Sequence, residues 1–197
     1  MRYGGCIFDF MRTKCYICNR SKTHEMAKLR IIGREYEQAI IRNYLESDKA
    51  ELIAVYGRRR VGKTYLVKSI FDNEFDFFYT GLYEVQRAIQ LNQFKKTLER
   101  YSGQKIKRFK DWFEAFDALR DYLDTLSKEK IIVFLDEIPW MDTPKSNFLA
   151  AFGQFWNDWA STKQNLKLFV CGICDHVDAF EIYWGQRRYL RQGLQAC

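Results

Sequence analysis

Short apolar runs alternate with amphipathic segments through the middle of the chain. The runs at 52–56, 131–135 and 166–171 are bounded by polar residues or glycine, and an aromatic run occupies 75–80. Largely apolar runs of this length predict strands that are buried on both faces, as in a parallel sheet. The pattern therefore predicts an α/β fold.

Helical spacing fills the intervals between these runs. Apolar residues recur three or four positions apart in 34–47, 65–71, 111–126 and 148–159, which is the spacing of one helix face. The third segment begins with Asp111, followed three residues later by a glutamate, as in a capping box. The fourth is so aromatic that we expect it to face the core, with a partner surface as the alternative.

A phosphate-binding motif directly follows the first predicted strand. Residues 57–64 read GRRRVGKT, the G-x-x-x-x-G-K-T pattern (Walker A) between a strand and a helix. The glycines let successive backbone N–H groups point at phosphate oxygens. Lys63 is expected to reach the β- and γ-phosphates, and the Thr64 hydroxyl to bind Mg²⁺. The predicted nucleotide contacts here are Gly57, Arg58, Arg59, Arg60, Val61, Gly62, Lys63, Thr64 and Tyr65. The three arginines either surround the phosphates or point toward a partner.

Two acids end the predicted strand at 131–135. Asp136 and Glu137 stand at the carboxyl end of a parallel strand, where ligands bind in open α/β sheets. Successive side chains point in different directions, so the two acids can take different roles. We predict that Asp136 holds Mg²⁺ (Walker B). The predicted catalytic residues are Glu137 and Lys63, of which Glu137 deprotonates the attacking water. The alternative is a solvated strand end. The spacing also predicts a strand between the phosphate-loop strand and the Asp136 strand, as in NTPases with a catalytic glutamate.

Further motifs accompany these two. They are IGRE at 32–35, YGRRRVGKT at 56–64, LDEIPW at 135–140, TPKS at 143–146 and FWN at 155–157. Together they resemble the prokaryotic, mainly archaeal, ATPase domain family within the AAA+/STAND P-loop NTPases. The resemblance covers 26–172 and implies a three-layer α/β/α core with a parallel sheet, ATP and Mg²⁺. It also implies that Gly33 and Arg34 lie near the adenine.

The chain departs from that family after residue 172. The family continues with a Gly-Ser-Ala-Thr stretch, which supplies a polar γ-phosphate sensor, and later a glycine-rich segment, whereas residues 173–178 read ICDHVD. Read one base later, one choice of synonymous codons for 173–193 encodes a peptide that begins SATTWM and contains GDKGG. We therefore predict that 173–197 is an out-of-frame tail. The core would then be truncated after its fourth strand and incomplete at the C-terminus, with an open sheet edge beside 52–56.

Composition supports this division of the chain. Of the six cysteines, five lie outside 26–172, as do both histidines. We predict that residues 1–25 are a non-native extension ahead of Met26. The alternative is a zinc site, for which only one pair of ligands is well spaced; its candidate ligands are Cys6, Cys15, Cys18 and His24. A disulfide framework is less favoured, because nothing suggests export.

Charge and hydropathy bound the function. The net charge of +7 permits an anionic ligand. No apolar stretch approaches 18 residues, so we expect no membrane span. The apolar run near the start is too short for a signal peptide, so we expect a cytoplasmic protein. We predict ATP binding and Mg²⁺-dependent hydrolysis by a regulatory switch. Nucleotide binding without turnover stays open, because the sensor is missing, as do a protein partner and self-association. A nucleic-acid-associated ATPase also stays open. The basic residues that would bind the nucleic acid are Lys95, Lys96, Arg100, Lys105, Lys107, Arg108 and Lys110.

Overall fold

The computed structural model describes residues 32–172 and 189–192. Its centre is a parallel sheet of five strands in the order β2-β3-β4-β1-β5. The strands are β1 (Glu51–Gly57), β2 (Phe77–Thr80), β3 (Ile131–Asp136), β4 (Leu166–Gly172) and β5 (Tyr189–Gln192). Because all the strands are parallel, their carboxyl ends share one edge of the sheet, which is where the predicted phosphate loop and acids lie.

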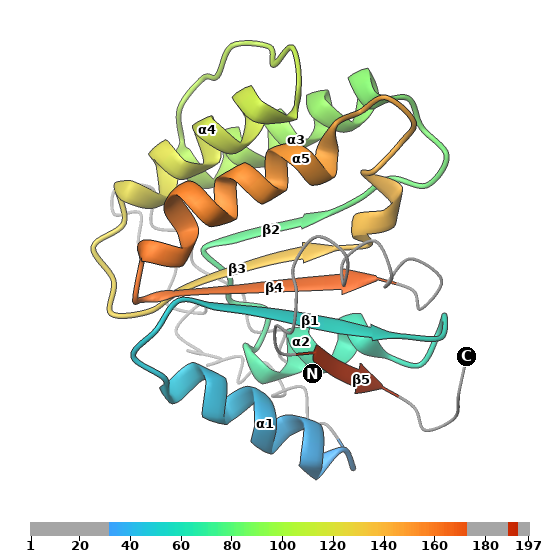
Figure 1. The fold of residues 1–197 in the computed structure, drawn as a ribbon, viewed down its shortest axis with the longest axis vertical. Coiled ribbons are helices and arrows are strands. Elements are labelled where there is room, and N and C mark those ends of the chain that lie inside the picture. The colour runs from blue at the N-terminus through green and yellow to red at the C-terminus, as the bar shows by residue number, and fades with distance from the viewer. Residues whose placement is uncertain (1–31, 173–188, 193–197) are drawn as a thin grey trace, which may run out of the picture.

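Helices cover both faces of the sheet (Figure 1). On one face lie α3 (Arg87–Ser102), α4 (Trp112–Asp124) and α5 (Phe148–Gln154). On the other lie α1 (Glu35–Glu46) and α2 (Lys63–Ile70). The predicted three-layer α/β/α fold with a parallel sheet is confirmed. Among the described residues, no helix is long and apolar enough to cross a bilayer.

Two hydrophobic cores fill the space between the layers. The larger lies under α3, α4 and α5 and is strongly aromatic; its largest fully buried members include Phe77, Phe94, Trp112, Phe148 and Phe152. The smaller joins α1 and α2 to the opposite face through Ile41, Ile53, Leu66, Phe134 and Phe169. The aromatic segment at 148–159 therefore faces the core, as predicted.

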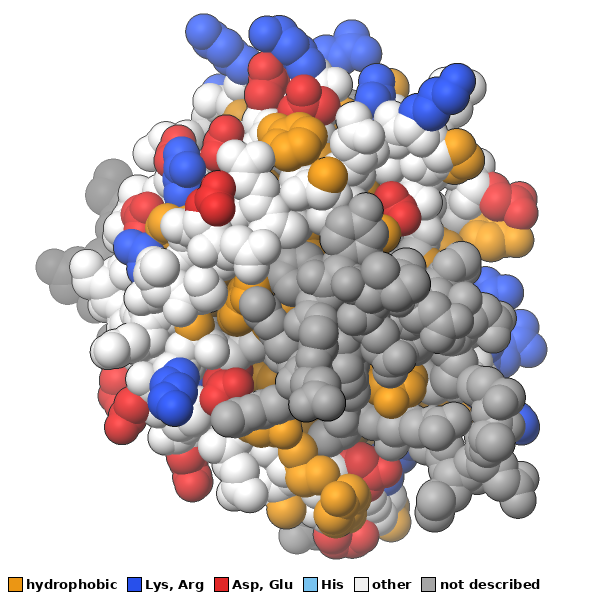
Figure 2. Space-filling view, viewed as in Figure 1, with side chains coloured by type: hydrophobic (Ala, Val, Ile, Leu, Met, Phe, Trp, Pro, Cys, Tyr) orange, Lys and Arg blue, Asp and Glu red, His pale blue; other side chains and the backbone are white. Residues whose placement is uncertain are grey.

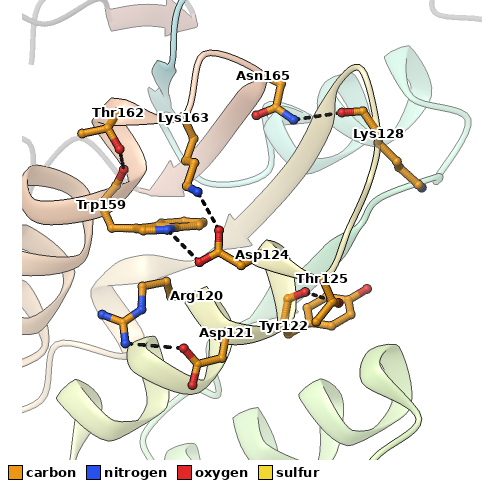
Figure 3. A network of polar contacts seen from close by, with 10 residues as sticks. All are labelled: Arg120, Asp121, Tyr122, Asp124, Thr125, Lys128, Trp159, Thr162, Lys163 and Asn165. Atoms are coloured by element: carbon orange, nitrogen blue, oxygen red, sulfur yellow. Dashed lines mark hydrogen bonds and ion pairs between the residues drawn. The ribbon is translucent and has the colours of Figure 1, made fainter.

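That aromatic segment is not a regular α-helix throughout. After α5 it widens into a π-helical turn over Phe155–Trp159. Figure 3 shows how the end of this turn is tied to α4. Trp159 Nε1 donates to Asp124 Oδ2 at 3.1 Å, and Lys163 Nζ lies 2.7 Å from Asp124 Oδ1. The carboxylate at the end of α4 thus connects the end of this segment to α4, a contact that local spacing could not predict.

The predicted additional strand lies where expected, but it comes from later in the chain. β4 separates β1 from β3, while β2, the run between the two motifs, is at the outer edge. The expectation of an open edge beside β1 is corrected, because β5 pairs with β1 from Ala54–Tyr189 to Gly57–Gln192. Residues 1–31, 173–188 and 193–197 lie outside the described residues, so the predicted extension and out-of-frame tail stay predictions.

The first half of the predicted capping box is present at the start of α4. Asp111 Oδ1 accepts a hydrogen bond from the Glu114 N–H at 3.0 Å. The return bond goes one residue further back than in a capping box, because Glu114 Oε2 accepts from the Lys110 N–H, at 2.9 Å, and not from that of Asp111. The segment at 138–146, by contrast, begins with a 3₁₀ turn over Ile138–Trp140. This turn brings Trp140 back over the carboxyl edge of the sheet, close to the phosphate loop.

Candidate nucleotide-binding site

The phosphate loop connects β1 to α2 at the carboxyl edge of the sheet. Gly62 caps α2 with φ of +84°, a left-handed conformation that glycine adopts without strain. Arg60 also has positive φ, +63°. These turns bring the start of α2 back onto the end of β1, so the first N–H groups of the helix open into the curve of the loop.

Lys63 is buried inside this loop, with 5% of its surface exposed. Its Nζ donates to the carbonyl of Gly57 at 2.9 Å and to that of Arg58 at 2.8 Å. Both carbonyls belong to the loop that the lysine follows. The ammonium group is therefore held at the centre of the loop curve, where a bound phosphate would meet it.

Thr64 joins the loop to the end of β3. Its hydroxyl contacts both carboxylate oxygens of Asp136, at 3.1 and 3.0 Å, across 72 residues of chain. Asp136 is 3% exposed. Burial raises the pKa of this carboxyl, whereas hydrogen bonds from Thr64, the Cys171 thiol and the Glu137 N–H favour its ionised form. A buried carboxylate beside a hydroxyl is the oxygen-only donor set that suits Mg²⁺, which takes its remaining ligands from phosphates and water.

Glu137, the residue after Asp136, has a left-handed backbone conformation and a carboxylate oxygen without a hydrogen-bond partner in the described structure. Its φ is +51°, so its side chain leaves the strand direction. Its Oε2 is buried and has no hydrogen-bond partner within the described part of the chain. Burial and the neighbouring charge of Asp136 raise the pKa of this carboxyl, while Lys63 and Arg59 lower it. The structure therefore presents a carboxylate oxygen that can accept a hydrogen bond from a bound water.

Arg34 contacts the same loop, and Gly33 directly precedes Arg34 in the chain. The Arg34 guanidinium donates to the carbonyl of Val61, and Gln38 Nε2 donates to the carbonyl of Gly33 at 2.8 Å. The segment that the family resemblance assigned to the adenine is thus adjacent to the phosphate loop.

The remaining predicted contacts are more exposed. Arg58, Arg59 and Arg60 all have exposed side chains, and Tyr65 is 47% exposed on α2. Of these, Arg59 contacts aromatic rings: its guanidinium lies over the rings of Tyr83 and Trp140. Neither Tyr83 nor the buried Gln90 behind it could be found from the sequence, because both contact Trp140, which lies far away in the chain.

The described residues contain no cluster of three or more His, Cys, Asp and Glu side chains that could hold a metal ion by themselves. The zinc alternative is not tested by this, because its candidate ligands in residues 1–25 lie outside the described residues.

Sequence comparisons link this site to archaeal proteins. A family model described as an ATPase domain predominantly from Archaea matches residues 31–176. The uncharacterized protein MJECL04 of Methanocaldococcus jannaschii is 29% identical over 121 residues, which are 61% of this chain and 25% of that protein. The uncharacterized ATP-binding protein MJ0423 of the same organism is 42% identical over 43 residues, 22% of this chain and 73% of that protein. This chain therefore matches about a quarter of MJECL04.

Solved structures share the fold at low sequence identity. The Walker-type ATPase PABY2304 of Pyrococcus abyssi superposes with a TM-score of 0.55 and 18% identity, over 82% of this chain and 53% of that one. The ORC2 protein of Aeropyrum pernix, solved as ADPNP–ADP complexes, gives 0.56 and 18%, over 82% of this chain and 48% of that one. This chain thus spans about half the length of either.

Proposed function

Because this chain belongs to the family of ATPase domains found predominantly in Archaea, we propose that it binds ATP with Mg²⁺ and hydrolyses it at the carboxyl edge of its sheet. The observation that carries the proposal is the contact of the Thr64 hydroxyl with Asp136. It brings together two motifs 72 residues apart, and each of them is suited to one half of a metal–nucleotide complex.

Binding of the phosphates falls to the loop. The N–H groups at the start of α2 and the Lys63 ammonium provide positive charge for the β- and γ-phosphates. Exposed Tyr65 and Arg58 to Arg60 would border the phosphates. The contact of Arg34 with the Val61 carbonyl supports a position for Gly33 and Arg34 beside the nucleotide.

Magnesium would be held by Thr64 and Asp136. When bound, Mg²⁺ neutralises negative charge on the phosphates. The buried carboxylate of Asp136 would then keep its charge with a cation beside it, which offsets the cost of its burial.

Glu137 would act on the attacking water. Its unpartnered Oε2 can accept a hydrogen bond from that water and then take its proton. Burial raises the pKa of this carboxyl, which makes the carboxylate a better base near neutral pH. The charges of Lys63 and Arg59 counter part of this rise in pKa.

The test is phosphate release from ATP by the wild type and by Glu137→Gln. We expect the variant to lose about 10²- to 10⁴-fold in kcat, the range for a general base, while the Kd for ATP stays within about threefold. Equal turnover in both proteins would contradict the assignment of Glu137. A wild type that binds ATP but releases no phosphate would favour the alternative of nucleotide binding without turnover.

We further propose that nucleotide binding serves a regulatory switch, in which the γ-phosphate orders the loops around it and hydrolysis releases them. The measurement is backbone hydrogen exchange with ADP and with a non-hydrolysable ATP analogue. Greater protection of 57–64 and 136–146 with the ATP analogue is expected. Identical protection in the two states would contradict a switch.

A second candidate function, nucleic-acid association, has its own support. In the connection between α3 and α4, Phe109 is buried and the Ile106 N–H donates to Glu99 at 3.0 Å. Lys105, Lys107 and Arg108 in this connection are exposed, and Lys and Arg side chains gather along the outer edge of the molecule beyond α3 and α4 (Figure 2). Such a basic surface fits a phosphate backbone.

The test is DNA binding at several salt concentrations. If the surface binds DNA, affinity should fall steeply with salt, and reversing the charges of Lys105, Lys107 and Arg108 should reduce the slope by about 0.9 per lost phosphate contact. Lys95 is less available, because it is half-buried and pairs with Glu99 at 3.1 Å, whereas Lys110 stays exposed beside Glu114 at 3.3 Å. An affinity that the reversal leaves unchanged would contradict this function.

A further inference from the structure

Arg59 connects the phosphate loop to two other loops at the carboxyl edge of the sheet. Its guanidinium carbon lies 5.6 Å from the ring centre of Tyr83 and 5.7 Å from that of Trp140. The two rings contact each other edge to face, with centroids 5.3 Å apart. Tyr83 follows β2, and Trp140 follows β3. A guanidinium over two aromatic faces is an attractive contact, so three separate loops meet at one side chain.

Gln90 on α3 forms hydrogen bonds to the backbone of the two loops that carry these rings. It is fully buried. Its Nε2 donates to the carbonyls of Leu82 and Trp140, each at 2.7 Å. Its Oε1 accepts from the Leu82 N–H at 3.1 Å and from the Tyr79 hydroxyl at 2.9 Å. Both donors and the acceptor of the amide are therefore used, and one side chain fixes the backbone next to Tyr83 and that of Trp140 itself.

The loop that carries Tyr83 also contacts the backbone of Asp136 and Glu137. The N–H of Gly81 donates to the carbonyl of Asp136 at 2.9 Å. A Cβ added to Gly81 would lie only 2.6 Å from the carbonyl oxygen of Glu137. A shift of the segment around Tyr83 would therefore displace the backbone that carries Asp136 and Glu137.

We propose that Gln90 is a positioning residue for ATP hydrolysis, which acts through Tyr83, Trp140 and Arg59 to set the phosphate loop against Glu137. The proposal rests on the proposed function. Gln90 touches neither acid, so its effect passes through the backbone of the two loops and the guanidinium contact. ATP binding depends mainly on the backbone of the phosphate loop and on Lys63 and should persist when this unit is broken. The rate of hydrolysis depends on where Glu137 sits and should fall.

The experiment compares Gln90→Met with Gln93→Met on the same helix. Gln93 is half-buried, and its amide makes no hydrogen bond within the described part of the chain, so it controls for the loss of an amide from α3. We expect Gln90→Met to lower kcat about tenfold or more, with the Kd for ATP within about threefold of wild type. Gln93→Met should retain wild-type kcat. Equal kcat in all three proteins would overturn the proposal.

Because Gln90→Met removes buried hydrogen bonds, a second variant avoids the core. Tyr83 is 55% exposed, so Tyr83→Leu breaks the ring contact without opening a cavity. It should lower kcat as Gln90→Met does, while Tyr83→Phe, which keeps the ring, should restore it. The double variant should be no slower than the slower single variant, since both act through one unit. Multiplicative losses, or a slow Tyr83→Phe, would contradict the proposal.

Failure of the proposed function gives a different result. If the wild type releases no phosphate, hydrolysis and the positioning role are both contradicted. If the wild type turns over ATP and neither Gln90→Met nor Tyr83→Leu slows it, the positioning role alone is overturned.

Discussion

Two buried lysines lie at opposite edges of the sheet, and both donate hydrogen bonds to backbone carbonyls. Lys63, 5% exposed, donates to the carbonyls of Gly57 and Arg58 at the carboxyl edge. Lys167 on β4, 1% exposed, donates at the amino edge to the carbonyl of Ser47 at 2.6 Å and that of Lys49 at 2.5 Å. Burial and carbonyl partners therefore do not distinguish a binding lysine from a structural one.

Their surroundings differ. At the amino edge the polar groups around Lys167 satisfy one another: Ser47 Oγ lies 3.0 Å from Lys167 Nζ and donates to Glu51 at 2.7 Å. At the carboxyl edge two acids have raised pKa values, and Glu137 keeps an oxygen without a partner in the described structure. A saturated network stabilises the fold, whereas an unsatisfied acid beside a cation marks a place for chemistry.

The largest difference should appear when Lys63 is replaced. Lys63→Met removes the charge that would meet the β- and γ-phosphates, so we expect ATP affinity to fall about 100-fold or more, from charge-assisted hydrogen bonds of about 1.5–3 kcal/mol each. Calorimetric titration of ATP in Mg²⁺ measures this loss. The melting temperature should also fall, because the carbonyls of Gly57 and Arg58 lose their donor. Near-normal ATP affinity would remove the distinction between the two lysines.

Lys167→Met should lower stability without weakening ATP binding. The carbonyls of Ser47 and Lys49 lose a buried donor, which costs about 1–3 kcal/mol of unfolding free energy, or very roughly 2–10 °C in Tm for a chain of this size. ATP affinity should stay within about twofold, because the site lies at the other edge. Thermal denaturation and the same titration measure both. An ATP defect without destabilisation would contradict the structural role.

Thr64→Val tests whether the carboxyl edge holds a cation. The substitution keeps the side-chain shape and removes the hydroxyl that contacts Asp136. Loss of one ligand interaction worth about 1.4 kcal/mol should weaken ATP binding in Mg²⁺ about tenfold. Binding with EDTA present should match wild type. Equal losses with and without Mg²⁺ would indicate a role in folding the loop instead.

The smallest expected effect is the pH dependence of stability without nucleotide or Mg²⁺. Burial raises the pKa of Asp136 and of Glu137 above ordinary values of 3.8 and 4.5. The folded state then binds more protons than the unfolded one, so these groups reduce the free energy of unfolding as pH rises above about 4. Glu137→Gln should flatten that fall. Chemical denaturation at several pH values measures it, and an unchanged slope would contradict the raised pKa of Glu137.

At the amino edge the sign reverses. Burial lowers the pKa of Lys167 below its ordinary 10.5, so the folded state loses this proton first and stability rises with pH toward 10.5. Lys167→Met should remove that rise.

The fold and the chemical motifs could be predicted because their signals are local. A buried strand, a glycine-bounded loop and a helix follow one another over 52–71, and Asp136 and Glu137 end their own strand. Parallel strands then bring both motifs to one edge without further information.

What the sequence did not reveal depends on distant contacts. Lys167 interrupts an apolar run, and its partners at Ser47 and Lys49 lie 120 and 118 residues away. Gln90 reads as an ordinary polar residue of a helix, since Trp140 is 50 residues from it. The strand β5 beside β1 was not expected either. The sequence around 189–192 contains no apolar run long enough to predict a strand.

The most direct test of the central claim is a crystal structure of the protein with Mg²⁺ and a non-hydrolysable ATP analogue. We predict the triphosphate inside the loop at 57–64, with Lys63 on the β- and γ-phosphates and the cation between Thr64 and Asp136. A triphosphate bound elsewhere, or a cation held by other residues, would contradict the account.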